Sequence, residues 1–534
     1  MFALPLSIYI YILNFKGGIM KSDVIIENDT DLKKSDATFY ISIALTLAIV
    51  LWGLILPSSF ESAGNATFGY LVNNFGWLYT ISMSSFVVFC AYLAFSKYGT
   101  LKLGPDNSKP EYTLISWFAM LFSAGMGIGL VFWGAAEPMN FYVNPIIGIE
   151  GGTPEAASFA MQHSFMHWGL HPWANYSVLA LAMAYMQFRK GKPALVSSVF
   201  IPIVGEKAVK SWFGKMIDVC AIFATVAGVA TSLGLGTYQI NSGLNYLFGV
   251  PENSMVQIII VGVITAIFML SAMAGVDKGM KFISNLNVGV ILLMLVVCFL
   301  VGPTLLILKV FVESLGNYMG GFVTASFEMG TFTNDSWYGS WTVFYWAWWI
   351  AWAPFVGSFI ARISKGRTIR EFITGVLLAP TLASFIWFSV FGSMGLAQGI
   401  DLAKEAIAST PTALFVVLSK YPMGMVVSII AVILLCTFFI TSADAATFVL
   451  GMLSSKGDLN PSVKKKLLWG AVQSGLALAL MLASANGLKM LQTISLVAAF
   501  PFVFIMIFAM ISLMKSLKAE KNWNKEEIEI EQIN

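Results

Sequence analysis

Runs of about 20 apolar residues recur along most of this sequence, and they restrict the fold more than any other feature. Such a run is long enough to cross a hydrocarbon core of about 30 Å as an α-helix. Hydrophobic residues make up 57% of the 534 residues and charged residues only 11%, whereas soluble domains carry about 25% charged residues. Because lipid offers no hydrogen bonds to the backbone, runs that cross it must be helical. The sequence therefore predicts an all-α integral membrane protein.

Twelve apolar runs are predicted to span the membrane, and the distribution of basic residues checks that number. The spans are 39–57, 75–96, 113–136, 163–188, 217–246, 255–274, 286–308, 340–361, 372–394, 425–453, 467–484 and 491–514. Lysine and arginine concentrate in cytoplasmic loops. All but four of the 31 basic residues fall in the two terminal segments and in alternate loops, the exceptions being Lys309, Lys404, Lys420 and Lys489. Both termini are therefore predicted to be cytoplasmic.

The two ends of the chain are predicted to lie outside the transporter domain, which covers residues 39–514. Residues 1–38 form a cytoplasmic segment, and residues 515–534 form a tail of mixed charge. Residues 16–20 can be encoded by a purine-rich ribosome-binding site and a start codon, so we expect translation to begin at Met20 and residues 1–19 to be an upstream extension. A signal peptide is less favoured because the apolar run 2–15 lacks a small-residue cleavage site.

One further segment, about 310–337, is apolar but interrupted by glycines. We expect it to lie along the outer membrane surface as an amphipathic helix. The cysteines fall inside apolar runs without metal or disulfide spacing, so they are interpreted as inert packing residues; they are Cys90, Cys220, Cys298 and Cys436.

Several classes of function are disfavoured because the sequence lacks the motifs or segments that they need. It has no GxxxxGK[ST] phosphate-binding loop, which argues against an ATP-driven pump. No loop is long enough for a soluble catalytic domain, so we expect a transporter and not an enzyme. A net charge of +3 gives no sign of nucleic-acid binding.

The third span contains three glycines in alternation, Gly125, Gly127 and Gly129. Each glycine disfavours helix by about 1 kcal/mol relative to alanine. Gly125 and Gly129 could serve helix packing as a GxxxG face, but Gly127 lies on a different face. The triplet therefore favours an unwound stretch near the middle of the membrane, whose free carbonyls face a substrate or ion.

The eighth span carries four large rings on one helical face, at Tyr345, Trp348, Trp349 and Trp352. An interfacial aromatic belt is the alternative, but this stripe extends over two turns. The fourth span adds three more rings, at Trp168, Trp173 and Tyr176. Ring faces attract cations without needing donated protons, which suits a trimethylammonium group better than a primary amine.

The three histidines, His163, His167 and His171, share one face of the fourth span. Two histidines four residues apart can bind zinc, but no cysteine or carboxylate of ligand spacing accompanies them. We expect interhelical hydrogen bonds, with pH sensing as a lesser alternative.

In the tenth span, Thr441, Ser442 and Asp444 place two hydroxyls and a carboxylate inside the membrane. One interpretation is that the hydroxyls bond only to the preceding turn, whereas an intramembrane carboxylate is functional by default. Spacing alone leaves sodium coupling and proton coupling both open.

Three stretches, 125–138, 167–176 and 345–368, resemble signatures of the betaine/carnitine/choline transporter family, and the resemblance extends over nearly the whole chain. It implies a leucine-transporter-like core of two inverted five-helix repeats, about 113–308 and 340–514, preceded by two extra helices. It also implies a homotrimer in the cell membrane, which we expect to be bacterial.

The resemblance also implies a set of binding residues. The substrate cage falls on Trp168, Trp173, Tyr176 and Trp349, beside Gly125, Met126, Gly127 and Gly129, with an exit path past Trp348 and Trp352. A sodium site falls on Ser123, Met126, Phe438, Thr441 and Ser442. A second sodium site falls on Thr225 and Phe355, where Val229 replaces a threonine expected one turn later.

Two details narrow the expected substrate and coupling ion. Choline-carrying members have an aspartate at the position of Gly129, so glycine favours the osmoprotectant glycine betaine, which carries its own carboxylate. Sodium-independent exchangers use a buried arginine, whereas Arg189, Arg362, Arg367 and Arg370 lie in loops or at span ends. We therefore predict sodium symport with no other cofactor. The alternatives are proton-coupled choline or betaine symport, sodium-independent carnitine exchange, and a histidine-based membrane metalloenzyme.

Overall fold

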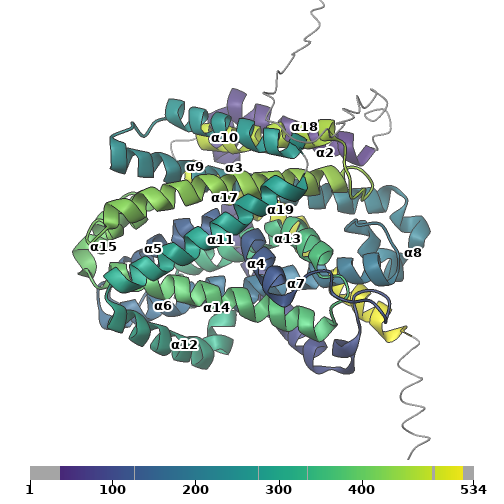
Figure 1. Cartoon of the computed structure of the whole chain (residues 1–534), viewed down its shortest axis with the longest axis horizontal. Helices are drawn as coiled ribbons and strands as arrows, with labels where there is room; N and C mark the ends of the chain where they lie inside the picture. The colour runs from purple at the N-terminus through teal and green to yellow at the C-terminus, as the bar shows by residue number, and fades with distance from the viewer. Residues whose placement is uncertain (1–36, 126, 275, 334, 484–486, 521–534) are drawn as a thin grey trace, which may run out of the picture. The chain divides into compact units, whose positions relative to one another are not determined.

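The computed structural model describes residues 37–125, 127–274, 276–333, 335–483 and 487–520. Within these ranges the regular structure is helical, apart from one isolated bridge between Lys102 and Thr368, which confirms the all-α prediction (Figure 1). Ten of the helices in these ranges are long and apolar enough to cross a membrane. The twelve-span count and the repeat boundaries stay predictions.

The helices fall into three sets. Those on predicted spans are α2 (Ala37–Ile55), α3 (Pro57–Phe95), α9 (Trp212–Phe248), α10 (Ser254–Ala274), α11 (Val276–Val301), α13 (Phe344–Ile363), α14 (Ile369–Leu396), α17 (Gly424–Leu453) and α19 (Gly487–Lys518). Interrupted or more polar spans fall on α4 (Leu114–Gly125), α5 (Ile128–Val143), α6 (Pro154–Trp168), α7 (Leu170–Ala184) and α18 (Val463–Leu482). The others are α8 (Ile201–Val209), α12 (Thr304–Phe327), α15 (Gly399–Ile407), α16 (Ala413–Leu418), η1 (Lys97–Thr100), η2 (Tyr185–Arg189), η3 (Ser197–Phe200), η4 (Gly339–Val343) and η5 (Thr410–Thr412).

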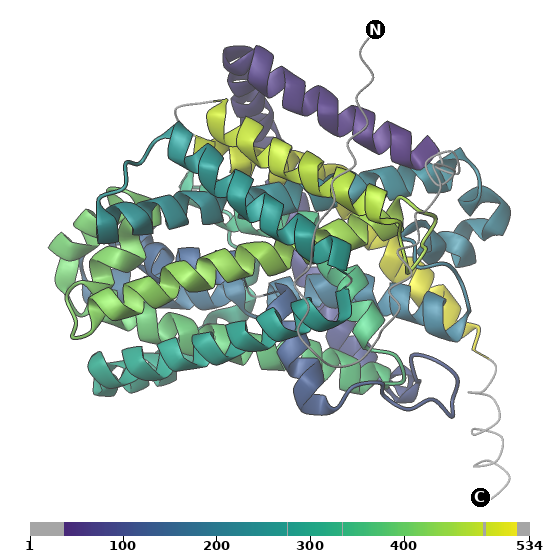
Figure 2. The same ribbon diagram turned by 45° about the horizontal axis from the view of Figure 1, so that its top comes forward.

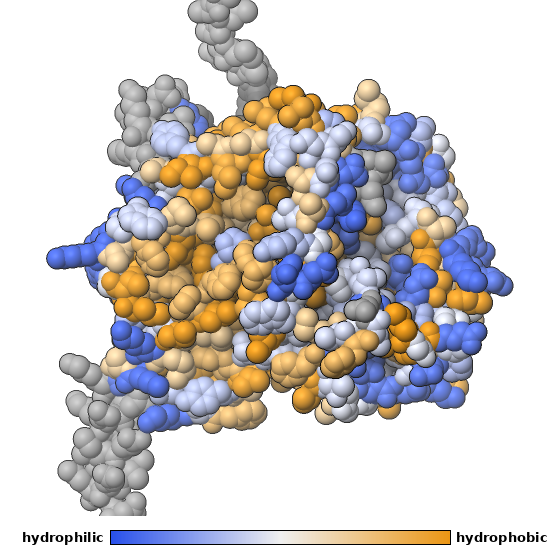
Figure 3. Space-filling model, turned by 180° about the vertical axis from the view of Figure 1, so that it is seen from behind, coloured by the Kyte–Doolittle hydropathy of each residue, from blue (hydrophilic) through white to orange (hydrophobic). Residues whose placement is uncertain are grey.

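The long helices run in roughly the same direction across Figures 1 and 2, and α9 packs against both α17 and α19. Seen from behind, a broad hydrophobic area lies between hydrophilic side chains at the two edges (Figure 3). That arrangement is typical of a protein embedded in a bilayer, where apolar side chains face lipid and charged ones face water.

Several predicted boundaries are wrong. Residues 58–74 were expected to connect the first two spans, but α3 begins at Pro57 and continues for 39 residues. At 1.5 Å per residue this helix is about 58 Å long, which is longer than a hydrocarbon core of about 30 Å. The segment expected at 310–337 is instead α12, a helix of 24 residues that ends at Phe327.

Helix α12 is continuous in spite of its internal glycines. Asn317 donates a hydrogen bond to Ser158 on α6, with 2.9 Å between Nδ2 and Oγ. The hydroxyl of Tyr318 accepts one from the backbone N–H of Leu170, the first residue of α7, at 3.1 Å. These contacts hold α12 against the fourth-span helices. By length and composition α12 is one of the ten helices that could cross a membrane, which does not fit the expectation that its glycines exclude a span. Its position along a membrane surface stays a prediction.

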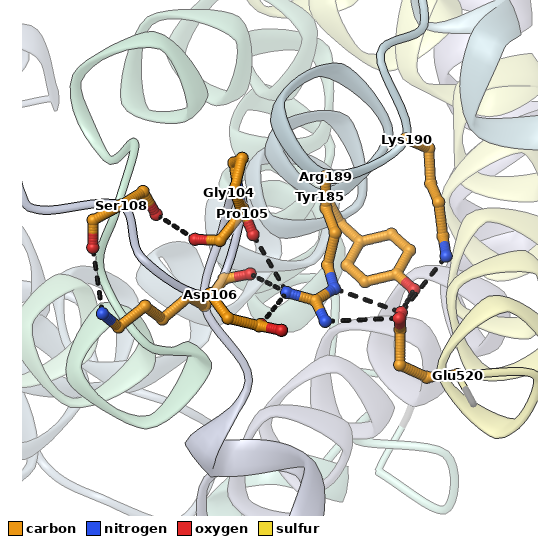
Figure 4. A network of polar contacts seen from close by, with 9 residues as sticks. Gly104, Pro105, Asp106, Ser108, Tyr185, Arg189, Lys190 and Glu520 are labelled. Atoms are coloured by element: carbon orange, nitrogen blue, oxygen red, sulfur yellow. Dashed lines mark hydrogen bonds and ion pairs between the residues drawn. The ribbon is translucent and has the colours of Figure 1, made fainter. Parts of the chain in front are cut away.

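Segments predicted to be cytoplasmic lie together. The loop after α3 pairs with the loop after α13, since the N–H of Leu103 donates to the carbonyl of Arg367 at 2.8 Å. Arg189, at the end of η2, donates to Gly104 O at 2.9 Å and to Asp106 at 2.7 Å. On its other side it pairs with Glu520, just beyond α19 (Figure 4). This grouping agrees with the loop assignment from basic residues.

Glu520 also accepts hydrogen bonds from Tyr185 at 2.5 Å and Lys190 at 3.2 Å. Burial acts to raise the pKa of this carboxyl, but the hydrogen bonds, led by the one from Arg189, outweigh it and lower the pKa to about 2. The carboxylate therefore stays charged, and paired with Arg189, throughout the neutral and mildly acidic range.

Candidate functional site

The third span is broken at the glycine triplet, which confirms the predicted break; that its carbonyls face a substrate or ion stays a prediction. Helix α4 ends at Gly125 and α5 begins at Ile128, with Gly127 at φ −124°, ψ −129° as its non-helical N-cap. A Cβ on Gly127 would lie 3.3 Å from the Ser442 hydroxyl, so the break lies beside the predicted sodium segment on α17. Met126 and the side chain of Ser123 lie outside what the structure describes.

The fourth span was predicted as one helix over 163–188, and this is wrong. Helix α6 begins earlier, at Pro154, and ends at Trp168, and α7 begins at Leu170. Gly169 sits at the break, where a Cβ would lie 2.5 Å from the carbonyl oxygen of Phe165. The sequence did hold a signal, since Pro172 is typical of the first turn of a helix.

The predicted cage rings meet between α6, α7 and α13. The ring centroids of Trp168 and Trp349 are 4.9 Å apart, and those of Tyr176 and Trp349 are 6.2 Å apart. Trp173 joins the cluster through Tyr176, with a centroid distance of 5.6 Å. All four side chains are at most 3% exposed. Rings from two parts of the sequence therefore converge, as the cage prediction requires.

The stripe on α13 faces inward, so the alternative of an interfacial belt is wrong. Trp348 stacks on Trp349 at 4.8 Å and 14° and meets Trp168 edge to face at 6.2 Å. Further along, Trp352 is 6% exposed and packs so closely on α9 that a Cβ on Gly228 would lie 2.4 Å from its ring.

The backbone of α5 contacts this cluster at Gly129. A Cβ at Gly129 would lie 2.8 Å from Cη2 of Trp348 and 3.1 Å from Cη2 of Trp168. Any side chain there must displace an indole ring. Glycine at this position therefore brings the first turn of α5 directly against the rings.

The closest ring pair is in direct contact in this structure. The planes of Trp168 and Trp349 are inclined at 81°, an edge-to-face arrangement favoured by aromatic pairs. No group fits between two rings at this separation. A cation must therefore bind at ring faces turned away from this contact, or the rings must separate.

A buried carboxylate that the sequence analysis did not single out holds part of the cluster in place. Oε2 of Glu137, on α5, accepts hydrogen bonds from Trp168 Nε1 at 2.8 Å and from the Tyr345 hydroxyl at 2.5 Å. Oε1 lies 2.8 Å from Nδ1 of His167, whose Nε2 lies 3.0 Å from the hydroxyl of Thr342. Glu137 is fully buried. It directly follows the predicted third span, 113–136, and that position was the available signal, because carboxylates placed inside a membrane are usually functional.

The histidines follow the expected pattern in two cases of three. His167 links α6 to α5 and η4 through the bonds above, and His171 Nε2 lies 3.1 Å from the Ser326 hydroxyl on α12. His163 instead lies 3.1 Å from the Phe159 carbonyl of its own helix. Across the described ranges, no group of three potential metal-binding side chains comes together.

In the predicted sodium segment, the Thr441 hydroxyl bonds within its own helix and also accepts a hydrogen bond from Asn287 on α11, with 3.4 Å between Nδ2 and Oγ1. Thr441 Oγ1 donates to the carbonyls of Thr437 at 3.1 Å or Phe438 at 3.2 Å, the bond to the preceding turn that was one of the two readings. Asp444 turns toward α10, where its carboxylate accepts a hydrogen bond from Ser271 at 3.1 Å.

At the predicted second sodium site, the Thr225 hydroxyl bonds to the carbonyl of Ala221 at 2.8 Å, one turn earlier on α9. The Phe355 ring packs on Trp352 at 5.5 Å. Helices α9 and α13 are in contact, so the two residues belong to neighbouring elements.

Comparison with known proteins adds an independent observation. Residues 37–522 match the family described as "BCCT, betaine/carnitine/choline family transporter". The glycine betaine transporter OpuD of Bacillus subtilis is 50% identical over 498 residues, which cover 92% of this chain and 96% of OpuD. A probable glycine betaine transporter of Desulfitobacterium hafniense is 44% identical, covering 91% and 98% of the two chains. The ectoine/hydroxyectoine transporter of Virgibacillus pantothenticus is 41% identical, covering 91% and 97%.

Proposed function

The chain belongs to the betaine/carnitine/choline transporter family, and from that premise we propose that it takes up glycine betaine by sodium symport. It is a membrane transporter and not an enzyme. The observation that carries the choice of substrate is the convergence of Trp168, Trp349 and Tyr176 beside Gly129. Two of the relatives compared above are glycine betaine transporters by name.

Both ends of glycine betaine have a counterpart in this cluster. Its trimethylammonium group would lie on the indole and phenol faces, each contributing about 0.5–2 kcal/mol. Its carboxylate would lie toward the N-terminus of α5, where Gly127 provides no side-chain cap and the first backbone N–H groups favour an anion. Because Trp168 and Trp349 are in contact, the trimethylammonium group would bind at ring faces turned away from that contact.

Sodium would bind between the broken third span and α17. The proposed ligands are backbone carbonyls of Ser123, Met126 and Phe438 with the hydroxyls of Thr441 and Ser442. The approach of Gly127 to the Ser442 hydroxyl supports this site. The Thr441 hydroxyl would break its hydrogen bond to the preceding turn and bind the ion through its oxygen. A second ion at Thr225 and Phe355 would lack one hydroxyl, because Val229 stands one turn later.

We also propose that the protein forms a homotrimer in the bacterial cell membrane, with both termini in the cytoplasm and a core of two inverted repeats. Arg189 contacts both the loop at Gly104 and Glu520 near the C-terminal end. This supports the proposal that these loops and the C-terminal end lie on the same side of the membrane.

Uptake of labelled glycine betaine into proteoliposomes tests the proposal. We expect uptake to require an inward sodium gradient, to fail when lithium replaces sodium, and to be lost in Thr441→Ala but retained in part in Thr441→Ser. Uptake that does not depend on sodium but is abolished by a protonophore would indicate proton symport. Exchange of carnitine in ion-free vesicles would point to antiport. Competition with choline, carnitine and ectoine would identify the preferred solute.

A further inference from the structure

The break in the fourth span lies directly beside the aromatic cluster. Trp168 is the last residue of α6, and Gly169 separates it from Leu170, the first residue of α7. The carbonyl of His167, in the last turn of α6, accepts the indole N–H of Trp349 at 2.9 Å. Carbonyls in the last turn of a helix have no partner within that helix, so the break leaves this one available to Trp349. The position of the break therefore affects two rings of the predicted cage.

The first turn of α7 receives a hydrogen-bond acceptor from another helix. A helix begins with backbone N–H groups that have no intrahelical partner, and a polar N-cap side chain normally accepts from one of them. Gly169 is the N-cap of α7 and makes no side-chain hydrogen bond. The N–H of Leu170 donates instead to the hydroxyl of Tyr318, on α12, at 3.1 Å. Tyr318 therefore does for α7 what an N-cap side chain normally does.

The Tyr318 side chain is held at the break by packing. It is 4% exposed, and its ring meets that of Phe385, on α14, edge to face at 5.0 Å. Phe385 in turn stacks on Phe165 of α6 at 4.0 Å and 7°. A Cβ on Gly169 would lie 2.7 Å from the Tyr318 hydroxyl, so glycine at the break lets the hydroxyl approach the backbone. Removing the hydroxyl alone would leave these ring contacts in place.

Two further polar contacts of α12 lie beyond the break and away from it. Helix α12 packs against α6 and α14 (Figure 1), and Oγ of Ser326 lies 3.1 Å from Nε2 of His171, the second residue of α7. Asn317, next to Tyr318, instead bonds to Ser158 in the first half of α6. Neighbouring residues of α12 therefore contact the break and a place remote from it, so a role at the break can be separated from the packing of α12.

We propose that Tyr318 is a positioning residue for betaine binding. Its hydroxyl fixes the break between α6 and α7 and so keeps Trp168 and Trp349 in the arrangement that binds the substrate. Tyr318 acts through the backbone at Leu170 and not by contact with betaine. The inference rests on the proposed function, because it concerns the affinity of the same site.

The first test needs no betaine. Tyr318→Phe removes only the hydroxyl, and hydrogen–deuterium exchange of the unliganded full chain is measured at the amide of Leu170. We expect exchange there to become about threefold to tenfold faster, because the amide loses its hydrogen bond. Tyr79→Phe is the control, since it removes a similarly buried hydroxyl that bonds to the carbonyl of Leu496, and it should leave exchange at Leu170 unchanged. Unchanged exchange in Tyr318→Phe would overturn the proposal.

The second test measures betaine affinity in the same variants. We expect Tyr318→Phe to raise the dissociation constant for betaine about threefold to tenfold, as the loss of one hydrogen bond predicts. Ser326→Ala should raise it by less, because Ser326 contacts a side chain and not the backbone at the break. Tyr79→Phe and Asn317→Ala each lose one hydrogen bond elsewhere, so they should lower the unfolding temperature and leave affinity unchanged.

The two proposals fail in different ways. If the unmodified protein binds no betaine, the proposed function is wrong, and the exchange measurement still tests Tyr318 at the break. If the unmodified protein binds betaine but Tyr318→Phe has unchanged affinity, or loses no more affinity than Asn317→Ala, the role of Tyr318 is refuted.

Discussion

The rings of the aromatic cluster differ in how their polar atoms are held. Trp168 donates its indole N–H to Glu137, and Trp349 donates its own to the carbonyl of His167 at 2.9 Å. The indole nitrogens of Trp348 and Trp352 and the hydroxyl of Tyr176 are buried with no partner in the described part of the chain. A ring tied by a hydrogen bond keeps its orientation, whereas an untied ring can turn without breaking one. We infer that Trp168 and Trp349 form the fixed part of the site.

The largest effect is expected from Glu137→Ala. This change leaves the donors of His167, Trp168 and Tyr345 buried without their acceptor, at about 1–3 kcal/mol each. We expect betaine binding to fall more than about 100-fold and the thermal unfolding temperature to drop, measured by equilibrium binding and a melting curve. Glu137→Gln retains one acceptor oxygen, so its betaine affinity and unfolding temperature should lie between those of the unchanged protein and of Glu137→Ala.

The control for that prediction is Glu313→Ala, which removes an exposed carboxylate on α12 and should change neither quantity. Normal binding in Glu137→Ala would show that the hydrogen bonds to Glu137 do not position the rings.

Removing one fixed ring is the next test. Trp349→Ala deletes a face of the cage together with its contact to Trp168, and we expect affinity for betaine to fall about 10-fold to 100-fold. Trp212→Ala is the matched control, because that tryptophan is 73% exposed at the start of α9. An equal loss of betaine affinity in both variants would show that Trp349 contributes no more to binding than an exposed tryptophan outside the cluster.

A smaller effect is expected from adding a methyl group at Gly129. Its Cβ would approach Trp348 to 2.8 Å and Trp168 to 3.1 Å, so Gly129→Ala must displace at least one indole. We expect affinity to fall several-fold, by about 1–2 kcal/mol, as is typical of overpacking. Gly262→Ala on α10 is the control, since no atom lies within 4 Å of its added Cβ. Unchanged affinity would show that the rings can shift freely.

The smallest effects separate the tied and untied rings directly. Both Trp349→Phe and Trp348→Phe retain an aromatic face, but only the first loses a hydrogen bond, normally worth about 0.5–1.5 kcal/mol. Titration with betaine should give a loss of about three-fold to tenfold for Trp349→Phe and less than about two-fold for Trp348→Phe. The reverse order would contradict the division into fixed and free rings.

Features that lie within one stretch of sequence were predictable. The apolar runs gave the all-α fold, and the glycine triplet gave the break before Ile128, because backbone preference is local. The period of 3.6 residues put Tyr345 and Trp349 on one face of α13, and the structure buries both.

Features that depend on distant contacts were not predictable in the same way. Glu137 finds a donor in Tyr345, 208 residues away in sequence, and no local pattern indicates that meeting. The break at Gly169 was missed because a single glycine is a weak signal inside an apolar helix. The length of α3 was missed because its polar first half does not look like a membrane span.

The central claim is that these rings bind a positively charged methylated nitrogen, and one pair of ligands tests it most directly. Tert-butylacetate has the shape and carboxylate of glycine betaine, but a neutral carbon replaces its nitrogen. If ring faces hold the cation, calorimetry should show betaine binding at least about tenfold more tightly, with most of that preference lost in Trp349→Ala. Equal affinity for the two ligands, or a preference that survives Trp349→Ala, would contradict the account.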